Sequence, residues 1–394
     1  PHPHPVAVVL VALAAAVVVT RALVDMALEV RSAHPMTPYV APQYWLTYEQ
    51  GFVRRALLGQ GAHLLAGGRD PSYQLVKVVG VALSVAAVLA VIVLALMLAR
   101  RATSRWTAVS VAAVVLVSPL GLSLLATDIG RTDSFGVVLL VVLLCLPWSR
   151  LPTALTVAGV ALITTAAVAA GEYLIAPVLP AGVATLWSSL ADRRRRITWS
   201  AAALAPCLLM TVLSAAVPPP LALINRTTAT ARAAGVPPPW TLVPGQGDHD
   251  SVSRLKYGFW DNLQIYYSIL TPQGVVATTV LWLGVYLLLV GAAWRLLGRG
   301  LVERRFLVVA TVFALSALAL SCAGIDYRRW WSLAVVGALG TLLQLTSGEQ
   351  ERPAVNDAAV VGALVCLAVA GVLLQNMPLW PARSFSELSA KFFG

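Results

Sequence analysis

Long blocks of apolar residues, almost free of charge, constrain the fold of this chain more than any other feature. The clearest blocks are residues 6–19, 78–98, 107–125, 275–290 and 308–320. A helix of about 20 apolar residues can cross a bilayer, because every backbone N–H and C=O is then hydrogen-bonded within the segment. The blocks lack the alternation of apolar and polar residues that marks the strands of a membrane β-barrel. The sequence therefore predicts an all-α bundle of transmembrane helices.

Composition supports a membrane protein. Hydrophobic residues make up 59% of the chain and charged residues 11%, with a mean hydropathy of +0.80, whereas soluble domains have about 25% charged residues. The scarcity of lysine beside abundant alanine, valine and arginine favours a bacterial source. The cysteines lie inside apolar blocks without a Cys-x-x-Cys spacing, which indicates neither a disulfide framework nor a zinc site.

Basic residues set the expected orientation. Arginines cluster near residues 100–105, 150, 193–196 and 295–305, between successive apolar blocks. Because basic loops stay in the cytoplasm, the pattern predicts about 11 spans in a bacterial cytoplasmic membrane, with the N-terminus inside. We expect an N-terminal membrane module (1–217), an outer loop (218–272) and C-terminal membrane helices (273–394). The net charge of +11 is explained by these loops, so no nucleic-acid partner is expected.

Two predicted outer loops carry amphipathic segments. In the first, residues 51–66 place Phe52, Leu57, Leu58, Leu64 and Leu65 mostly along one stripe, which predicts a helix lying in the membrane interface. In the other, residues 257–270 are rich in aromatic side chains, which are typical of the headgroup level. Proline triplets at 218–220 and 237–239 exclude a continuous helix through that loop.

Charged clusters also lie on the predicted outer side, where the positive-inside rule does not explain arginines. They comprise Glu49 with Arg54 and Arg55, Asp128 with Arg131 and Asp133, Glu172 with Tyr173, and Asp326 with Arg328, Arg329 and Trp330. Ionisable groups close to hydrocarbon are costly and tend to be paired around a polar cavity. Neighbouring acids and arginines can simply neutralise each other at a helix end, but four such clusters on one side favour a shared site.

The residue types in these clusters indicate a phosphate ligand. Arginine binds phosphate through two charge-assisted hydrogen bonds and stays protonated near lipid. A carboxylate among arginines can act as a general base toward a sugar hydroxyl. Together with an interfacial helix, these groups fit a polyprenyl-phosphate-linked sugar at the outer leaflet.

Three motifs carry a resemblance to membrane glycosyltransferases of the GT-C superfamily and, more weakly, to Wzy-type polysaccharide polymerases. They are Gly-Phe-Val-Arg-Arg (51–55), Asp-Ile-Gly-Arg-Thr-Asp (128–133) and Asp-Tyr-Arg-Arg-Trp (326–330). The resemblance implies sugar transfer from a polyprenyl-phosphate donor to a cell-envelope glycan or lipid-linked acceptor, with inversion and without a cofactor. It implies catalytic acids among Glu49, Asp128 and Asp133. It implies that the substrate is held by Arg54, Arg55, Arg131, Glu172, Tyr173, Asp326, Arg328, Arg329 and Trp330.

Alternatives remain open at this point. A Wzy-like polymerase would use the arginines to hold a diphosphate-linked repeat, and a lipid-linked sugar transporter or a non-catalytic partner of an envelope-assembly protein would need no base. Metal ligands are expected nowhere; His63, His249, Asp248 and Asp250 form the alternative ligand set, and their spacing favours a flexible acceptor loop.

Overall fold

The described part of the chain is helical throughout. The computed structural model describes residues 5–32, 36–37, 39–49, 51–101, 105–117, 129–190, 192–236, 252–257, 261, 263–264, 267, 270–297, 303–323 and 326–345, and these residues contain no strand. The long helices are α1 (Pro5–Arg31), α3 (Tyr73–Ala99), α4 (Arg105–Val117), α6 (Thr132–Cys145), α7 (Thr153–Ala170), α8 (Ile175–Ser189), α9 (Arg193–Ala216), α12 (Pro272–Leu297), α13 (Glu303–Ala323) and α14 (Tyr327–Leu345). The predicted all-α fold is confirmed for these residues.

Shorter elements connect the long helices. They are η1 (Ala41–Trp45), α2 (Leu57–Leu65), η2 (Trp148–Arg150), η3 (Glu172–Leu174), α10 (Leu221–Ala233) and η4 (Ser253–Lys256). Helix α10 begins directly after the proline triplet 218–220, because Pro220 is tolerated next to the first helical residue but not inside a helix.

Five of the described helices are long and apolar enough to cross a membrane: Tyr73–Ala99, Thr153–Ala170, Arg193–Ala216, Pro272–Arg295 and Arg304–Cys322. Large apolar side chains lie on their outer surfaces, among them Leu162 with 72% of its surface exposed. Such exposure is costly in water but not in lipid. These features are those of a multi-pass membrane protein. The eleventh predicted span, after residue 357, lies outside the described residues.

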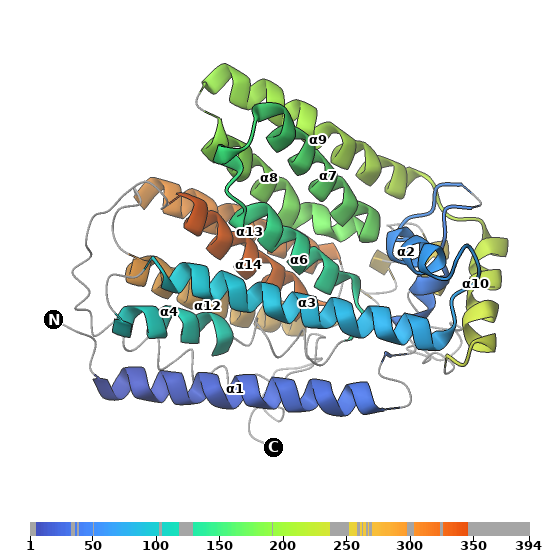
Figure 1. Cartoon of the computed structure of the whole chain (residues 1–394), viewed down its shortest axis with the longest axis horizontal. Coiled ribbons are helices and arrows are strands. Elements are labelled where there is room, and N and C mark those ends of the chain that lie inside the picture. Colours follow the sequence, from blue (N-terminus) through green and yellow to red (C-terminus); the bar gives the residue numbers. More distant parts are fainter. Residues whose placement is uncertain are drawn as a thin grey trace.

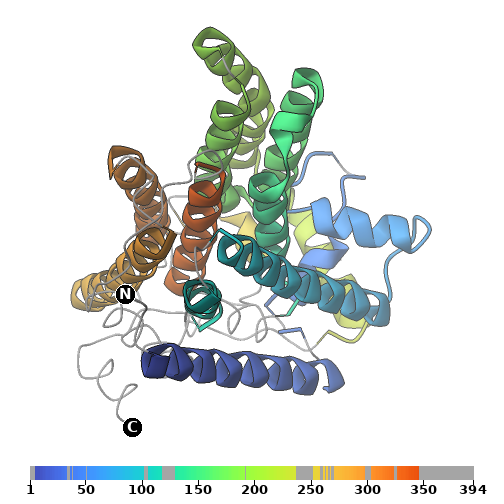
Figure 2. The ribbon, with the colours of Figure 1, turned by 60° about the vertical axis from the view of Figure 1, so that its left-hand side comes forward.

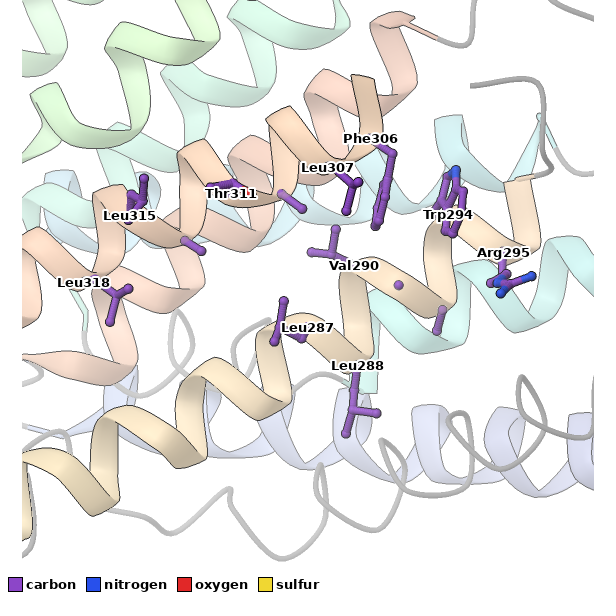
Figure 3. Close-up of a pocket in the computed structure, with 14 residues that line it drawn as sticks. Leu287, Leu288, Val290, Trp294, Arg295, Phe306, Leu307, Thr311, Leu315 and Leu318 are labelled. Atoms are coloured by element: carbon purple, nitrogen blue, oxygen red, sulfur yellow. The ribbon is translucent and has the colours of Figure 1, made fainter. Parts of the chain in front are cut away.

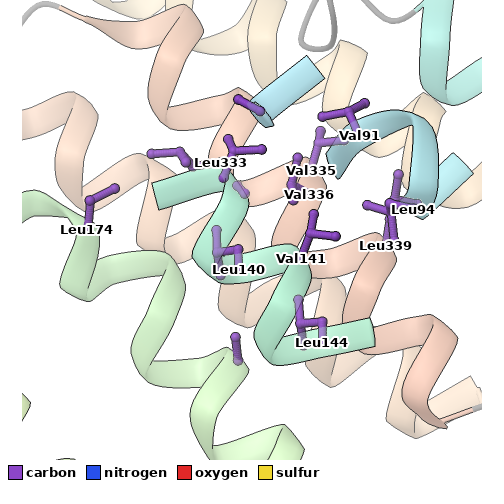
Figure 4. Packing of buried hydrophobic residues seen from close by; sticks show 14 of the residues in the cluster. Val91, Leu94, Leu140, Val141, Leu144, Leu174, Leu333, Val335, Val336 and Leu339 are labelled. Atoms are coloured by element: carbon purple, nitrogen blue, oxygen red, sulfur yellow. The ribbon is translucent and has the colours of Figure 1, made fainter. Parts of the chain in front are cut away.

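Helix α14 forms the centre of the bundle. All of its residues from Tyr327 to Leu343 are buried, and it packs against α6, α8, α12 and α13 (Figures 1 and 2). Two glycines allow close packing: a Cβ at Gly340 would lie 2.6 Å from the Leu144 side chain, and one at Gly337 would lie 2.1 Å from Phe313. Figure 4 shows Val335, Val336 and Leu339 of α14 beside the leucines and valines of α6 and α3.

The short elements η1, α2 and α10 pack together at one end of the bundle, where α2 also contacts α3 and α7 (Figure 1). A second, small core holds this end together, formed by Leu46, Val53, Ala56, Leu223, Ile224, Val252 and Leu255. This core joins the first predicted outer loop to residues 252–257 of the later one. It therefore fixes the chain segment 46–56, on which several of the predicted site residues lie.

The predicted interfacial helix is shorter than the sequence pattern indicates. Helix α2 begins at Leu57 rather than Gly51. Gly51 and Arg55 have backbone φ angles of 101° and 63°, and a right-handed helix cannot include residues with such angles. Phe52 of the predicted stripe therefore lies outside the helix, whereas Leu64 and Leu65 are exposed, at 67% and 68%, which a stripe facing lipid allows. The buried face consists of Gly59, Ala62 and His63.

Candidate functional site

Four chain segments bring charged side chains together at this end of the bundle. Segment 51–56 supplies Arg55, the first turn of α6 supplies Asp133, η3 supplies Glu172 and Tyr173, and the start of α14 supplies Asp326 and Arg329. Hydrogen bonds, ion pairs and a contact of the Arg55 guanidinium with the Tyr173 ring link these six residues into one network, called the charge network below. Residues from all four predicted clusters meet here, but Glu49 pairs with His63 instead, and Asp128 lies outside the described residues.

Arg55 and Glu172 form a two-pronged ion pair. The Arg55 Nε lies 2.8 Å from Oε2 of Glu172, and its Nη2 lies 2.5 Å from Oε1. Both side chains are partly exposed, at 23% and 25%. Burial opposes ionisation of Glu172, but the charge and hydrogen bonds of Arg55 outweigh it and lower the pKa of Glu172 to about 2. The carboxylate thus stays ionised and holds the guanidinium in one orientation.

The backbone of Arg55 is unusual for a residue with a side chain. Its φ of 63° lies in the left-handed region, which costs free energy for any residue other than glycine. The conformation aims the side chain at Glu172 and places its guanidinium 5.8 Å from the centre of the Tyr173 ring. Tertiary contacts, not local preference, therefore hold Arg55.

Tyr173 connects the Arg55 pair to the buried half of the network. Its hydroxyl donates to Oδ1 of Asp133 at 2.6 Å and accepts a hydrogen bond from Thr132. Burial and the neighbouring Asp133 carboxylate raise the pKa of Tyr173, so the hydroxyl remains a proton donor. Tyr173 thus contacts both ion pairs, since its ring faces Arg55 and its hydroxyl binds Asp133.

Asp133 and Arg329 form the most buried ion pair of the network. Arg329 Nη1 donates to Oδ2 of Asp133 at 2.5 Å, with side-chain exposures of 7% and 6%. The second terminal nitrogen of Arg329, Nη2, forms an ion pair with Asp326, three residues earlier. Arg131 Nε lies 3.9 Å from the same Asp133 oxygen. Among the described residues, the buried Arg329 Nε has no hydrogen-bond partner.

A tight turn before α6 positions Arg131 and Asp133. Gly130 has a φ of 80°, which favours glycine. Its carbonyl accepts hydrogen bonds from Gln43 Nε2 at 3.1 Å and the Tyr44 hydroxyl at 2.6 Å, and its N–H donates to Ser84 Oγ at 3.0 Å. Gln43, Tyr44 and Ser84 were not among the predicted site residues. They lie far along the chain from the charged motif at 128–133, and the sequence alone does not show that they contact Gly130.

The Arg54 side chain has different hydrogen-bond partners from that of Arg55. Its Nη2 donates to the backbone carbonyls of Leu255 at 2.6 Å and Tyr257 at 2.9 Å. Its Nε is buried without a hydrogen-bond partner, and burial lowers the pKa of Arg54. Arg54 therefore ties segment 46–56 to residues 252–257 while keeping a positive charge beside Arg55.

Glu49 pairs with His63, a residue that the sequence placed only in the alternative set of metal ligands. His63 Nε2 lies 3.0 Å from Oε1 of Glu49, and the Glu49 side chain is 53% exposed while that of His63 is 8% exposed. Within the described part of the chain, the buried Nδ1 of His63 has no hydrogen-bond partner. Helix α2, which carries His63, is held tightly: a Cβ at Gly59 would lie 1.9 Å from the Leu46 carbonyl oxygen. The Glu49 carboxylate is thus accessible, and its partner His63 lies on a closely packed helix.

The remaining predicted residues fall into different environments. Asp128 lies outside the described residues, as do His249, Asp248 and Asp250. Trp330 is 8% exposed and packs on Tyr327 with ring centres 6.0 Å apart, so its ring lies in the core. Arg328 is also buried, at 4%. Rather than lying in a loop, residues 327–330 form the first turn of α14. Among the described residues, no three His, Cys, Asp or Glu side chains cluster as metal ligands.

The balance of charge at this end is positive. Five arginines, Arg54, Arg55, Arg131, Arg328 and Arg329, outnumber the four carboxylates of Glu49, Asp133, Glu172 and Asp326. The N-terminal ends of α6, α8 and α14 also lie next to the network, and a helix N-terminus favours negative charge. Excess arginine beside helix N-termini is suited to an anionic group.

Comparison of the chain with protein-family models, with curated proteins and with solved structures finds no match. A fold by itself does not specify an activity, so the function has to be inferred from the side chains of the site.

Proposed function

We propose that this protein is a membrane glycosyltransferase that moves a sugar from a polyprenyl-phosphate donor to a cell-envelope glycan or lipid-linked acceptor. The observation that carries the proposal is the excess of arginines over carboxylates in and beside the charge network, at one end of an apolar helix bundle. A lipid phosphate is an anion that reaches a protein from the bilayer, and arginine is the side chain best suited to hold it there.

The proposed orientation has about 11 spans, the N-terminus in the cytoplasm and the network on the outer face. The arginine-rich segments support it, because Arg100 follows α3, Arg150 follows α6 and Arg193 begins α9. The starts of α3 and α6 lie near η1 and the network, so Arg100 and Arg150 lie at the opposite ends of these helices. The positive-inside rule then puts those ends in the cytoplasm.

In the proposed reaction the network acts on the leaving group. Arg55 and Arg329 hold the donor phosphate and stabilise its charge as the bond between the sugar C1 and the phosphate oxygen breaks. The acceptor oxygen forms the new bond at C1 from the opposite side, which inverts the anomeric centre, and polyprenyl phosphate departs with its electron pair. Ion pairing with Glu172 and Asp133 pre-orients the two guanidiniums, so that little reorganisation is needed.

Glu49 is the proposed general base. It accepts the proton of the acceptor hydroxyl, since its carboxylate is exposed and held by His63. Asp133, a second predicted acid, is enclosed by Arg329 and Tyr173 and acts in this proposal as a positioning residue. Asp128 remains a candidate base from the sequence.

The test is transfer of radiolabelled sugar from polyprenyl-phosphate donors by the purified protein. Glu49→Gln is expected to lower kcat by about 10²–10⁴-fold, the usual contribution of a general base. Asp70→Asn is the matched control, an exposed acid of the same outer segment, and is expected to keep wild-type activity. Unchanged activity in Glu49→Gln, Asp128→Asn and Asp133→Asn would reject the acid assignments.

One observation favours a second candidate, a polymerase that uses diphosphate-linked repeats. Arg54, Arg131 and Arg328 are present in addition to the arginines that pair with Glu172 and Asp133, and a diphosphate has more negative charge to match these arginines than a monophosphate has. Failure with every monophosphate donor, together with turnover of diphosphate-linked repeats, would select this candidate and overturn the first.

A further inference from the structure

A groove lies between the second half of α12 and residues 306–318 of α13, outside the charge network. Its volume is about 530 Å³. The lining is apolar except for Thr311 and Arg295, and includes Leu287, Gly291, Leu315 and Leu318 (Figure 3). A groove of this composition takes a hydrocarbon chain rather than a polar ligand.

One end of the groove carries aromatic and positively charged side chains. Trp294 and Phe306 stack there with ring centres 4.3 Å apart and an interplanar angle of 12°, and the Arg295 guanidinium lies 5.3 Å from the Trp294 ring centre. Arg304 and Arg305 directly precede Phe306 and are exposed. Tryptophan beside arginine is typical of the level of lipid headgroups.

This charged end lies at the opposite end of α13 from the network. Phe306 lies in the first turn of α13, whereas Asp326 follows its last residue, Ala323. A helix rises about 1.5 Å per residue, so roughly 30 Å, the thickness of the hydrocarbon layer, separates the two ends. A lipid with its headgroup at Arg295 is therefore in the cytoplasmic leaflet and cannot also place its phosphate in the network.

We propose that this groove is a binding site for an anionic phospholipid of the cytoplasmic leaflet. One acyl chain lies along Leu287, Gly291 and Leu315, and the phosphate lies beside Arg295, Arg304 and Arg305. Charge complementarity selects an anionic over a zwitterionic headgroup, and each arginine near the surface contributes about 1 kcal/mol, or about fivefold in affinity. The proposal rests on the orientation given above and not on the enzymatic activity.

Gly291 offers a way to close the groove without disturbing the packing. A Cβ at Gly291 would meet no atom within 4 Å, so a larger side chain can enter the groove. Gly284, two turns earlier on α12, is equally open but does not line the groove. Gly291→Leu and Gly284→Leu therefore form a matched pair, of which only the first fills the site.

The experiment is native mass spectrometry of the delipidated full chain, titrated with phosphatidylglycerol or phosphatidylcholine of equal chain length. Wild type and Gly284→Leu are expected to bind one phosphatidylglycerol at least about fivefold more tightly than phosphatidylcholine. Gly291→Leu is expected to lose this bound lipid. Arg295→Gln is expected to keep lipid binding and to lower the preference for the anionic headgroup by about fivefold, because Arg304 and Arg305 remain.

Three outcomes would overturn the proposal. They are equal affinity of the wild type for the two phospholipids, undiminished phosphatidylglycerol binding by Gly291→Leu, and displacement of the bound phospholipid by polyprenyl phosphate, which would make the groove part of the donor site. Loss of glycosyl transfer in the Glu49→Gln variant leaves all three measurements unaffected, so the two proposals fail separately.

Discussion

Two helices of this protein begin with an aspartate followed closely by arginines, and the two beginnings differ in burial. Helix α9 starts with Asp192 and Arg193 to Arg196, and most of these side chains are exposed. Helix α14 is preceded by Asp326 and carries Arg328 and Arg329 in its first turn, where both arginines are buried. Arginine in a first turn opposes the helix dipole in either case, so in neither place do the arginines stabilise their own helix.

The partners of the two aspartates explain the difference. Asp192 accepts hydrogen bonds from the backbone N–H groups of Arg194 and Arg195, at 3.2 and 3.3 Å, and so caps its helix. Asp326 instead pairs with the guanidinium of Arg329, which also binds Asp133 from another helix. The same short motif forms a helix cap in one place and part of the candidate site in the other.

Removal of the buried arginine is the strongest test of this contrast. We expect Arg329→Gln to lower the free energy of unfolding in detergent by about 3–5 kcal/mol, because it leaves the buried Asp133 carboxylate without its main partner. Arg194→Gln, at the exposed helix start, is expected to change it by less than about 0.5 kcal/mol. Equal losses in the two variants would mean that burial does not distinguish the two helix starts.

The geometry of Arg55 can be tested separately from its charge. Arg55→Lys keeps the positive charge but cannot form both hydrogen bonds to Glu172. A hydrogen bond to a charged group contributes about 1.5–3 kcal/mol, so we expect kcat/KM for sugar transfer to fall by about 10- to 150-fold. Arg69→Lys, an exposed position of the same outer segment, serves as the control and is expected to retain full kcat/KM.

Acid pH is expected to weaken the network through Glu172. Because folding lowers the pKa of Glu172 from 4.5 to about 2, its contribution to stability is complete above pH 4.5 and is lost as the pH falls from about 4.5 toward 2. The difference in Tm between wild type and Glu172→Gln should therefore shrink over that range. A difference in Tm that stays constant from pH 6 to pH 3 would contradict the ion pair.

The cap of α9 provides the smallest effect. Asp192→Ala removes the acceptor for two backbone N–H groups, and loss of a helix cap costs about 1 kcal/mol. We expect a small decrease in unfolding free energy and an unchanged kcat for sugar transfer, since Asp192 contacts no residue of the charge network. A large loss of activity in this variant would assign the α9 start a role that its exposure does not indicate.

Much of the architecture could be predicted from the sequence because hydropathy is a local property. The apolar blocks 78–98, 275–290 and 308–320 lie within α3, α12 and α13, since each block satisfies its own backbone hydrogen bonds as a helix. The arginines of the predicted outer loops were also recognisable from the sequence, because the positive-inside rule does not explain them. Their roles in catalysis and binding remain predictions.

Only the tertiary structure decided which charges meet. Asp133 and Arg329 are 196 residues apart, and Arg55 and Glu172 are 117 apart. The start of α2, the burial of Trp330 and the Glu49–His63 pair likewise depend on neighbours from distant segments. An ion pair forms where two helix ends pack side by side, and that packing is determined by the shapes of many buried side chains together, such as those around Gly337 and Gly340. The sequence alone determined a helical membrane chain with charges at its helix ends, and the packing of those ends turned the charges into one network.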